Sequence, residues 1–256
     1  MRYLVGGQGK PLVLCHGFLS SAEEFGGRFS SLARDRRLIV PDLPGNAASA
    51  PLRSRHTAEA MAEGVDRLLT QLDIREFDLG GLCLGASVAC ALARRSAKVG
   101  RLVLHTPLLM PGLVRARHRI QVRVMTLPGV WEGVGWLSER RTVSDLYKRY
   151  MIREGPVDAR TAQINFDNQV RADKRAAKEW LIDALGRDDL AVLAERSEPT
   201  LIIISGNDGL VDVHRLQRLV ERLPRVRMYV DPDGGHGWSQ AAVQRHLTVL
   251  QTFFAP

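Results

Sequence analysis

Short apolar runs alternate with helix-spaced apolar patterns along most of this chain. Each run has the length of one buried strand, and the runs stand at 11–15, 38–40, 77–82, 101–104, 200–204 and 226–230. Parallel neighbouring strands need helical crossovers of this kind between them. We therefore predict an α/β fold whose central sheet is mostly parallel and has helices on both faces.

The alternation stops at residue 111 and resumes after residue 197. In between, apolar residues recur at helical spacing, as in the sets Val143, Leu146, Tyr147, Tyr150 and Ala177, Trp180, Leu181, Ala184. This interruption predicts a helical cap subdomain at 111–197. The core domain then consists of residues 1–110 and 198–256, and the chain is long enough to bury a core of that size.

Composition excludes several classes of function. The net charge of +8 comes mostly from arginines scattered among acids, without a dense basic tract that contains aromatics, so we expect no nucleic-acid partner. No apolar run approaches the roughly 20 residues that a bilayer requires, and the first residues lack a signal sequence, so we expect a soluble protein without membrane contact.

The sequence predicts neither a disulfide framework nor a metal site. Three cysteines lack the even count of disulfides and the paired spacing of zinc sites, which predicts reduced thiols in a cytoplasm. No cluster of His, Asp and Glu has ligand spacing. We predict neither a metal nor a cofactor.

Cys83 stands at the centre of the segment 81–85, Gly-Leu-Cys-Leu-Gly, directly after the apolar run at 77–82. A sharp turn there would strain the backbone and expose the thiol, and the flanking glycines permit close approach of other segments. Cys15 lies inside a predicted strand and Cys90 inside a predicted helix, where cysteine is usually a small buried hydrophobic residue. Cys83 alone lies where open α/β sheets bind ligands, and we predict that it is a nucleophile.

A thiol needs a base to become a thiolate, and a third group must hold that base in the correct tautomer. His236 follows the last predicted strand among glycines, and Asp208 follows the strand at 200–204. Both loops lie at the edge of the sheet where Cys83 lies, so we predict that His236 is the base and Asp208 the acid. Other acids nearby are Asp212, Asp231 and Asp233.

The segment around Cys83 resembles the nucleophile elbow of the α/β-hydrolase superfamily, Gly-x-Ser-x-Gly, with cysteine in place of serine. The resemblance extends over nearly the whole chain, and the order nucleophile, acid, histidine is that of the superfamily. It implies an α/β-hydrolase fold with a helical cap and a Cys83-His236-Asp208 triad. It also favours Asp208 over the neighbouring acids, because the superfamily's acid directly follows a strand.

Acyl transfer places negative charge on the carbonyl oxygen, which two converging backbone N–H groups must stabilise. Leu84 follows the nucleophile and supplies one of them. The resemblance implies that Phe18, which follows His-Gly after the first long strand, supplies the other. We expect Leu19, Trp131 and Trp136 to contact the substrate, although tryptophans in a cap more often fill its core.

The segment 42–49 reads Asp-Leu-Pro-Gly-Asn-Ala-Ala-Ser, where many superfamily members have Asp-x-x-Gly-His-Gly-x-Ser. This departure leaves the subfamily open. Cysteine in the elbow resembles dienelactone hydrolases, polyhydroxyalkanoate synthases and some thioesterases of natural-product assembly lines, although none matches closely. A haloalkane dehalogenase is excluded because it needs a carboxylate at position 83.

Basic residues are frequent in the first half of the predicted cap, namely Arg115, Arg117, Arg119, Arg123, Arg140, Arg141, Lys148, Arg149 and Arg153. Such a series is more often a solvated helix face. The alternative is a docking surface for coenzyme A phosphates or for an acidic carrier protein. The predicted partner is accordingly a small-molecule acyl substrate, free or bound to coenzyme A or a carrier protein.

We predict an enzyme that hydrolyses an ester or a thioester through a covalent acyl-Cys83 intermediate. A thiol ester is readily transferred to amines and thiols, so an acyltransferase or a chain-releasing cyclase of natural-product biosynthesis is the first alternative. A binding protein on a catalytically retired hydrolase fold is the second, because a fold alone does not prove activity.

Overall fold

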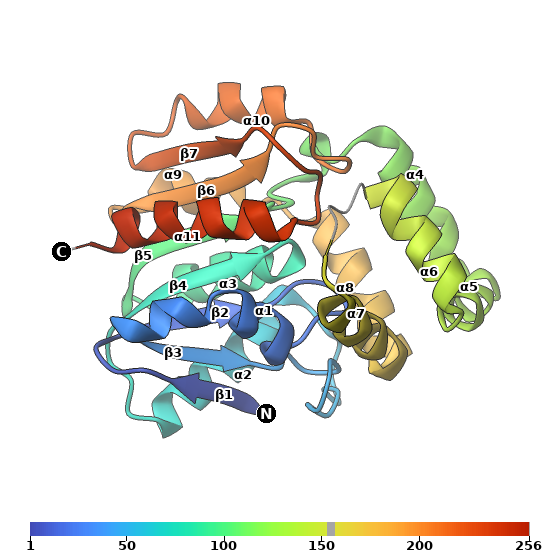
Figure 1. Ribbon diagram of the computed structural model, residues 1–256, viewed down its shortest axis with the longest axis horizontal. Coiled ribbons are helices and arrows are strands. Elements are labelled where there is room, and N and C mark those ends of the chain that lie inside the picture. Colours follow the sequence, from blue (N-terminus) through green and yellow to red (C-terminus); the bar gives the residue numbers. More distant parts are fainter. Residues whose placement is uncertain (153–156, 256) are drawn as a thin grey trace.

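Seven strands form one sheet within residues 1–152 and 157–255, the part of the chain that this computed structural model describes (Figure 1). Their order across the sheet is β1-β3-β2-β4-β5-β6-β7. The edge strand β1 is antiparallel to β3, and all other neighbours are parallel, which confirms the predicted sheet. The strands are β1 (Tyr3–Gly6), β2 (Lys10–Cys15), β3 (Arg36–Pro41), β4 (Phe77–Leu82), β5 (Val99–His105), β6 (Thr200–Ser205) and β7 (Val226–Asp231).

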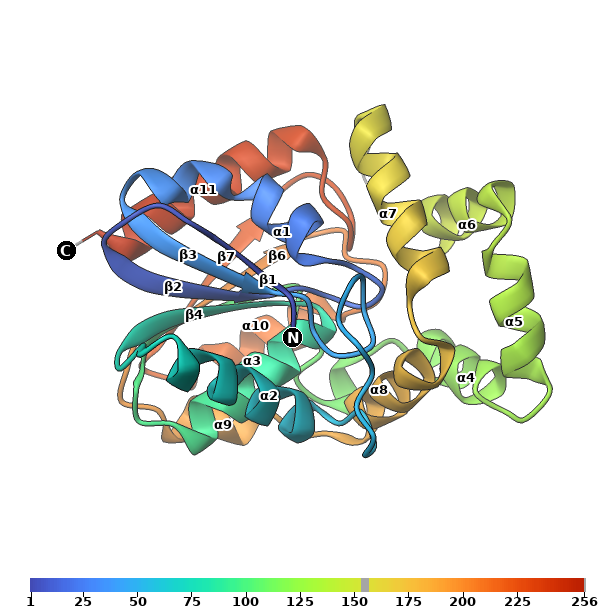
Figure 2. The same cartoon turned by 90° about the horizontal axis from the view of Figure 1, so that it is seen from below.

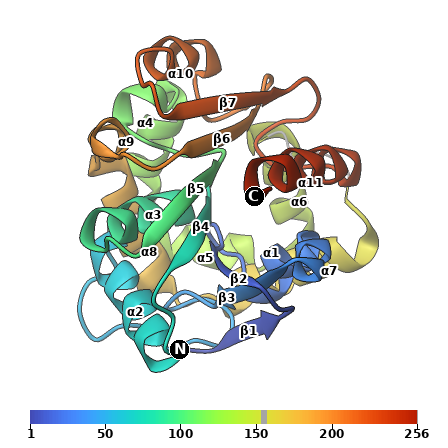
Figure 3. The ribbon, with the colours of Figure 1, turned by 90° about the vertical axis from the view of Figure 1, so that its left-hand side faces the viewer.

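Helices cover both faces of the sheet (Figure 3). Strand side chains alternate between the faces: in β2, Leu12 and Leu14 pack with α1 and α11, whereas Val13 and Cys15 pack with α2 and α3. The core therefore consists of two apolar layers with the sheet between them. Its helices are α1 (Ala22–Arg28), η1 (Ser30–Arg34), α2 (Ala58–Gln71), α3 (Leu84–Arg95), α9 (Leu190–Glu195), α10 (Val213–Val220) and α11 (Gln240–Phe254).

Two glycines let α3 approach the sheet closely. A Cβ atom on Gly85 would clash with the carbonyl oxygens of Cys15 and His16 at the end of β2. A Cβ atom on Gly81 would lie 2.5 Å from the carbonyl oxygen of Gly85, closer than real Cβ contacts allow. A larger side chain at either position would push β2, β4 and α3 apart, so these glycines set the shape of the turn between β4 and α3.

Between β5 and β6 the chain forms a series of helices beyond the carboxyl ends of the parallel strands (Figures 1 and 2). In Figure 2, α7 and α8 lie nearer to the sheet than α5 and α6 do. Within the described residues, no helix combines the length and the apolar character needed to cross a membrane. The helices are η2 (Pro111–Leu113), α4 (Ala116–Met125), α5 (Val130–Ser138), α6 (Arg141–Tyr147), η3 (Lys148–Ile152), α7 (Ala159–Arg171) and α8 (Lys174–Gly186).

The division between core and cap at residues 110/111 and 197/198 stays a prediction. Both α8 and α9 fall inside the predicted cap, yet Trp180 of α8 and Val192 of α9 belong to the buried cluster that α2 and α3 form on the sheet. Trp180 is only 1% exposed, and its ring meets that of Phe18 edge-on with 6.3 Å between centroids. The last part of the predicted cap thus packs as part of the core. Below, the cap denotes the helices from α4 to α7.

Candidate active site

Cys83 lies at the turn between β4 and α3 in a backbone conformation that few side chains adopt. Its φ of 51° lies in the left-handed region, which costs a non-glycine residue about 1–3 kcal/mol. The N–H of Cys83 donates to the carbonyl oxygen of His105 at the end of β5, over 2.9 Å. The neighbouring strand therefore holds the strained turn, and the thiol stands at the carboxyl edge of the sheet.

The environments of the three cysteines differ. Cys15 and Cys90 are fully buried, and burial raises the pKa of Cys15 to about 12 and also raises the pKa of Cys90. Cys83 is partly exposed and lines a cavity. A thiol reacts as its thiolate, and burial disfavours the thiolates of Cys15 and Cys90. Cys83 is the cysteine that a reagent or substrate can reach.

The structure brings Cys83, His236 and Asp208 together from three separate loops. The Nε2 atom of His236 lies 3.2 Å from the Sγ atom of Cys83, and its Nδ1 atom lies 2.9 Å from Oδ2 of Asp208. The other carboxylate oxygen of Asp208 accepts the N–H groups of Leu210 and Val211, at 2.8 and 2.9 Å. Two backbone N–H groups therefore hold the carboxylate that orients the imidazole.

Burial and neighbouring groups act in opposite directions on the pKa values of His236 and Asp208. Burial alone would lower the pKa of His236, but the Asp208 carboxylate and the Cys83 sulfur raise that pKa well above its ordinary value. Burial alone would raise the pKa of Asp208, but His236 and the two backbone N–H donors hold it below its ordinary value. The site thus favours an imidazolium beside the Asp208 carboxylate.

The neighbouring aspartates have other partners. Asp212 accepts the N–H of Arg215 and so caps α10. Asp231 and Asp233 both form ion pairs with Arg245. Among the aspartates of the described chain, Asp208 is the one within hydrogen-bond distance of the His236 ring.

The loop after β2 runs directly against the thiol. A Cβ atom on Gly17 would lie 3.4 Å from Cβ of Cys83. Buried His16 braces this loop, because its Nε2 accepts the N–H of Leu43 and its Nδ1 lies 2.8 Å from the carbonyl oxygen of Gly17. Burial lowers the pKa of His16, so a neutral ring braces this loop.

The N–H groups of Phe18 and Leu84 have no hydrogen-bond acceptor in the described part of the chain. Leu84 opens α3, and the first N–H groups of a helix have no intrahelical acceptor. Phe18 follows Gly17, which lies against Cys83. Both donors are therefore available beside the thiol.

A cavity of about 470 Å³ separates the thiol from the cap. Cys83, His236, Phe18 and Leu19 line its core side, and Trp131 lines its cap side. Most of the cap wall is apolar, with Val122, Met125, Val134, Leu137 and Val143 among its residues. A volume of this size accommodates a small organic molecule.

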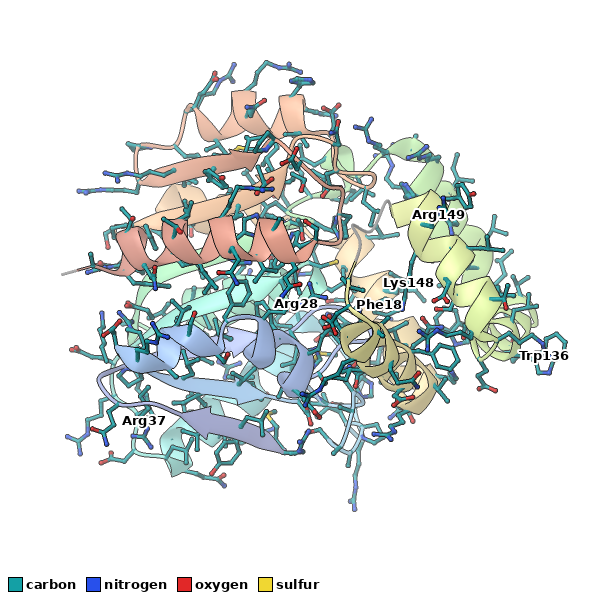
Figure 4. The ribbon with its side chains drawn as sticks, in the orientation of Figure 1. Phe18, Arg28, Arg37, Trp136, Lys148 and Arg149 are labelled. Carbon is teal, nitrogen blue, oxygen red and sulfur yellow. The ribbon has the colours of Figure 1, made fainter. Side chains whose placement is uncertain are left out.

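Trp136, which we expected to contact the substrate, lies away from the cavity. Trp136 is 58% exposed and does not line the cavity. The Cζ atom of Arg140 lies 3.3 Å from the centroid of the Trp136 ring. Figure 4 shows Trp136 at the outer end of the cap, far from Phe18. The reason is helical periodicity, because five residues turn an α-helix through about 140° and so separate Trp136 from Trp131.

The sequence did not indicate a polar part of the cavity wall. The Arg28 guanidinium donates to Glu24 at 3.1 Å, and the Ser20 hydroxyl donates to the other oxygen of that carboxylate at 2.7 Å. His118 and Lys148 reach the same cavity from the cap (Figure 4 labels Arg28 and Lys148). Ser20, Glu24 and Arg28 stand four residues apart and pair within the core, whereas His118 and Lys148 join this part of the wall only when the cap packs on the core.

The described residues contain no group of three His, Cys, Asp or Glu side chains that could hold a metal ion.

The sequence model of the alpha/beta hydrolase fold family matches residues 10–238. A 2-hydroxymuconate semialdehyde hydrolase from Pseudomonas sp. (strain CF600) is 25% identical over 244 residues, which cover 91% of this chain and 82% of that protein. Pimeloyl-[acyl-carrier protein] methyl ester esterase from Nitrosomonas europaea is 25% identical over 247 residues, which cover 90% of each chain.

Other similarities are shorter or structural. An acetyltransferase component of an acetoin cleaving system from Pseudomonas putida is 38% identical over 90 residues, so this chain spans 24% of its length. The solved structure of an esterase from Exiguobacterium antarcticum superposes with a TM-score of 0.83 and 17% identity, covering 98% of this chain and 94% of that one. At that identity the likeness shows the fold alone.

Proposed function

This chain belongs to the alpha/beta hydrolase fold family, and on that premise we propose that it cleaves an ester or a thioester through a covalent acyl-Cys83 intermediate. The family's esterases include a full-length relative, the methyl ester esterase from Nitrosomonas europaea, which supports ester hydrolysis in general. The cysteine nucleophile and the triad are our own inference from the geometry of the site.

One observation carries this proposal: His236 lies 3.2 Å from the Cys83 sulfur and 2.9 Å from Asp208, at the floor of a cavity. A base within this distance of the thiol can take its proton, and the acid keeps the imidazole in the tautomer that the transfer requires. The raised pKa of His236 favours the proton on the imidazole.

In the first half-reaction the Cys83 thiolate attacks the carbonyl carbon of the substrate. The N–H groups of Phe18 and Leu84, which have no other acceptor in the described part of the chain, donate to the oxygen that becomes negative. The bond to the leaving group then breaks, and the His236 imidazolium protonates that group. The product of this step is a thioester on Cys83.

In the second half-reaction a water molecule attacks the thioester. His236 accepts a proton from the water, and Phe18 and Leu84 stabilise the second oxyanion in the same way. The acid leaves, and the Cys83 thiolate and the imidazolium are restored. Asp208 stays ionised throughout and stabilises the imidazolium.

The apolar cap wall favours a second candidate, transfer of the acyl group to an acceptor other than water. Val122, Met125 and Val134 offer an organic acceptor a binding surface, and they reduce the room for water near the thioester. Comparing products with and without an added amine, alcohol or thiol distinguishes the two outcomes. A dominant amide, ester or thioester product would make the protein an acyltransferase or a cyclase.

Mass spectrometry of the intact protein after mixing with p-nitrophenyl esters and acyl thioesters tests the shared intermediate. We expect one acyl group to add to the wild type and none to the Cys83→Ala variant. An adduct that persists in the variant, or a complete lack of adduct with every substrate in the panel, would contradict the proposal. The second result would favour a binding protein on this fold.

A further inference from the structure

A second hollow, outside the active-site cavity, gathers four arginines of the described chain. Its volume is about 590 Å³, and its lining includes Arg115, Arg117, Arg119 and Arg215. The first three lie at the start of α4, whereas Arg215 comes from α10 of the core. Position 123 belongs to the same basic stretch of sequence, but its side chain does not line the hollow. Arg153 lies outside the described residues.

These four guanidinium groups have no carboxylate partner within 4.0 Å in the described part of the chain. They donate to backbone carbonyl oxygens instead, Arg115 to Asp208, Arg117 to Gly209, Arg119 to Pro111 and Arg215 to Gly112. A guanidinium has five N–H donors, so most of their donors stay available. The carboxylate that lines the hollow, that of Asp212, is already bonded to a backbone N–H of α10.

A group of unpaired like charges raises the electrostatic energy of the protein unless an anion neutralises it. The start of the ten-residue helix α4 adds to this positive field, because Ala116 lines the hollow and Arg115 provides no side-chain cap. Planar guanidinium groups bind carboxylate and phosphate oxygens in the same bidentate way, and a phosphate ester carries the larger negative charge. The hollow is therefore suited to phosphate groups.

The helix α4 and the loop that carries Asp208 form a common wall between the hollow and the active-site cavity. Arg115 and Arg117 of α4 face the hollow, while His118 and Val122 of the same helix face the cavity. Val114, which precedes α4, lines both spaces, so the hollow and the cavity adjoin each other.

We propose that this hollow binds the phosphate groups of a coenzyme A thioester whose acyl group reacts at Cys83, an inference that rests on the proposed function. A concave hollow of this volume suits a small phosphorylated molecule. A carrier protein would instead need a broader contact surface, of about 800 Å² on each partner. We therefore favour coenzyme A over a carrier protein.

Titration calorimetry of coenzyme A with the full-length protein tests the site without catalysis. Because Arg115 and Arg117 also hold the loop of Asp208, the variants to use are Arg119→Gln, Arg215→Gln and their combination. We expect each single change to weaken binding about tenfold, since each removes a charge-assisted hydrogen bond. Arg123→Gln is the matched control on α4, and it should bind coenzyme A as the wild type does.

Kinetics complete the test. The ratio of kcat/KM for an acyl-coenzyme A to kcat/KM for a neutral p-nitrophenyl ester should fall about a hundredfold in the double variant. Higher salt should lower the same ratio in the wild type, since it screens the phosphate attraction. Binding of coenzyme A that is absent, or equal in the double variant and the wild type, would overturn the inference, and so would activity confined to carrier-bound thioesters.

The calorimetry also separates this inference from the proposed function. Arginine-dependent binding of coenzyme A without any acyl-enzyme would overturn the proposed function and support the phosphate site. Acylation by neutral esters without binding of coenzyme A would do the reverse.

Discussion

The core and the cap bury their helices to very different degrees. In α3 every residue from Leu84 to Leu92 is buried, whereas α5 has no buried residue. Large exposed apolar side chains gather in the cap, including Ile120, Val124, Leu127, Trp136, Leu137, Leu146 and Tyr150. Close packing holds side chains in place, and segments with few buried contacts open at lower cost. We infer that the core fixes the reacting groups and the cap controls how a substrate reaches them.

The origins of the site residues support this division. Cys83, Asp208 and His236 all follow core strands. Backbone groups of the core hold Cys83 and Asp208, and the Asp208 carboxylate orients His236. The cap supplies the opposite wall of the cavity. Substitutions in the core should therefore change the rate of the chemical step, and substitutions in the cap should change substrate binding.

The largest effect should come from His236→Ala. Without the base, neither formation of the thiolate nor protonation of the leaving group is assisted, so kcat should fall by roughly 10⁵- to 10⁶-fold. Stopped-flow and steady-state assays with a p-nitrophenyl ester measure this loss, and circular dichroism verifies that the variant folds. A variant that folds and keeps more than a tenth of the activity would remove His236 from the mechanism.

A smaller loss should follow from Asp208→Asn, because an orienting carboxylate is commonly worth less than the base itself. We expect kcat to fall by roughly 10²- to 10⁴-fold, since the amide can hold the imidazole in the wrong tautomer. The matched control is Asp212→Asn, which alters the cap of α10 but not the imidazole. If Asp212→Asn lost activity and Asp208→Asn kept it, the choice of the acid would be wrong.

The fold and the triad geometry could be predicted because their signals are local. A buried strand that ends in Gly-Leu-Cys-Leu-Gly can only continue through a sharp turn, and loops after parallel strands meet at one edge of the sheet. Cys83 and His236 needed no more than this, whereas the choice of Asp208 among the neighbouring acids also rested on the resemblance to the superfamily. The apolar runs also predicted the six parallel strands, whereas the edge strand β1 was not predicted from the sequence.

The walls of the cavity and the arginine hollow could not be predicted in the same way. Helical spacing indicates a helix but not which face meets the rest of the protein, and charged residues occur all around α4. Trp131 and Trp136 looked equivalent in sequence for that reason. Arg215 is separated by nearly a hundred positions from the arginines of α4, and only the packing of α10 beside α4 brings them together.

The reactivity of the thiols should sharpen the contrast between buried and accessible positions. Iodoacetamide at neutral pH should alkylate Cys83 at least about a hundredfold faster than Cys15 or Cys90, because burial raises the pKa of Cys15 to about 12 and only thiolates react. Peptide mapping after timed quenching measures the three rates. In the unfolded protein the difference should disappear, and equal labelling in the folded protein would show that Cys83 is not an accessible thiol.

The smallest effect should appear within the cap, between two tryptophans of one helix. Trp131 lines the cavity and its Nε1–H donates to the carbonyl oxygen of Lys174 at 3.0 Å, so Trp131→Ala removes both a contact surface and an anchor of α5. Loss of about 50 Å² of apolar contact with a substrate corresponds to roughly a tenfold rise in KM, with little change in kcat. Trp136→Ala removes an exposed ring that contacts Arg140 and should leave both constants unchanged.

Steady-state kinetics with esters of increasing acyl length compare the two variants. Equal rises in KM would mean that α5 acts as one flexible surface, whereas a fall in kcat for Trp131→Ala would mean that the cap takes part in the chemical step.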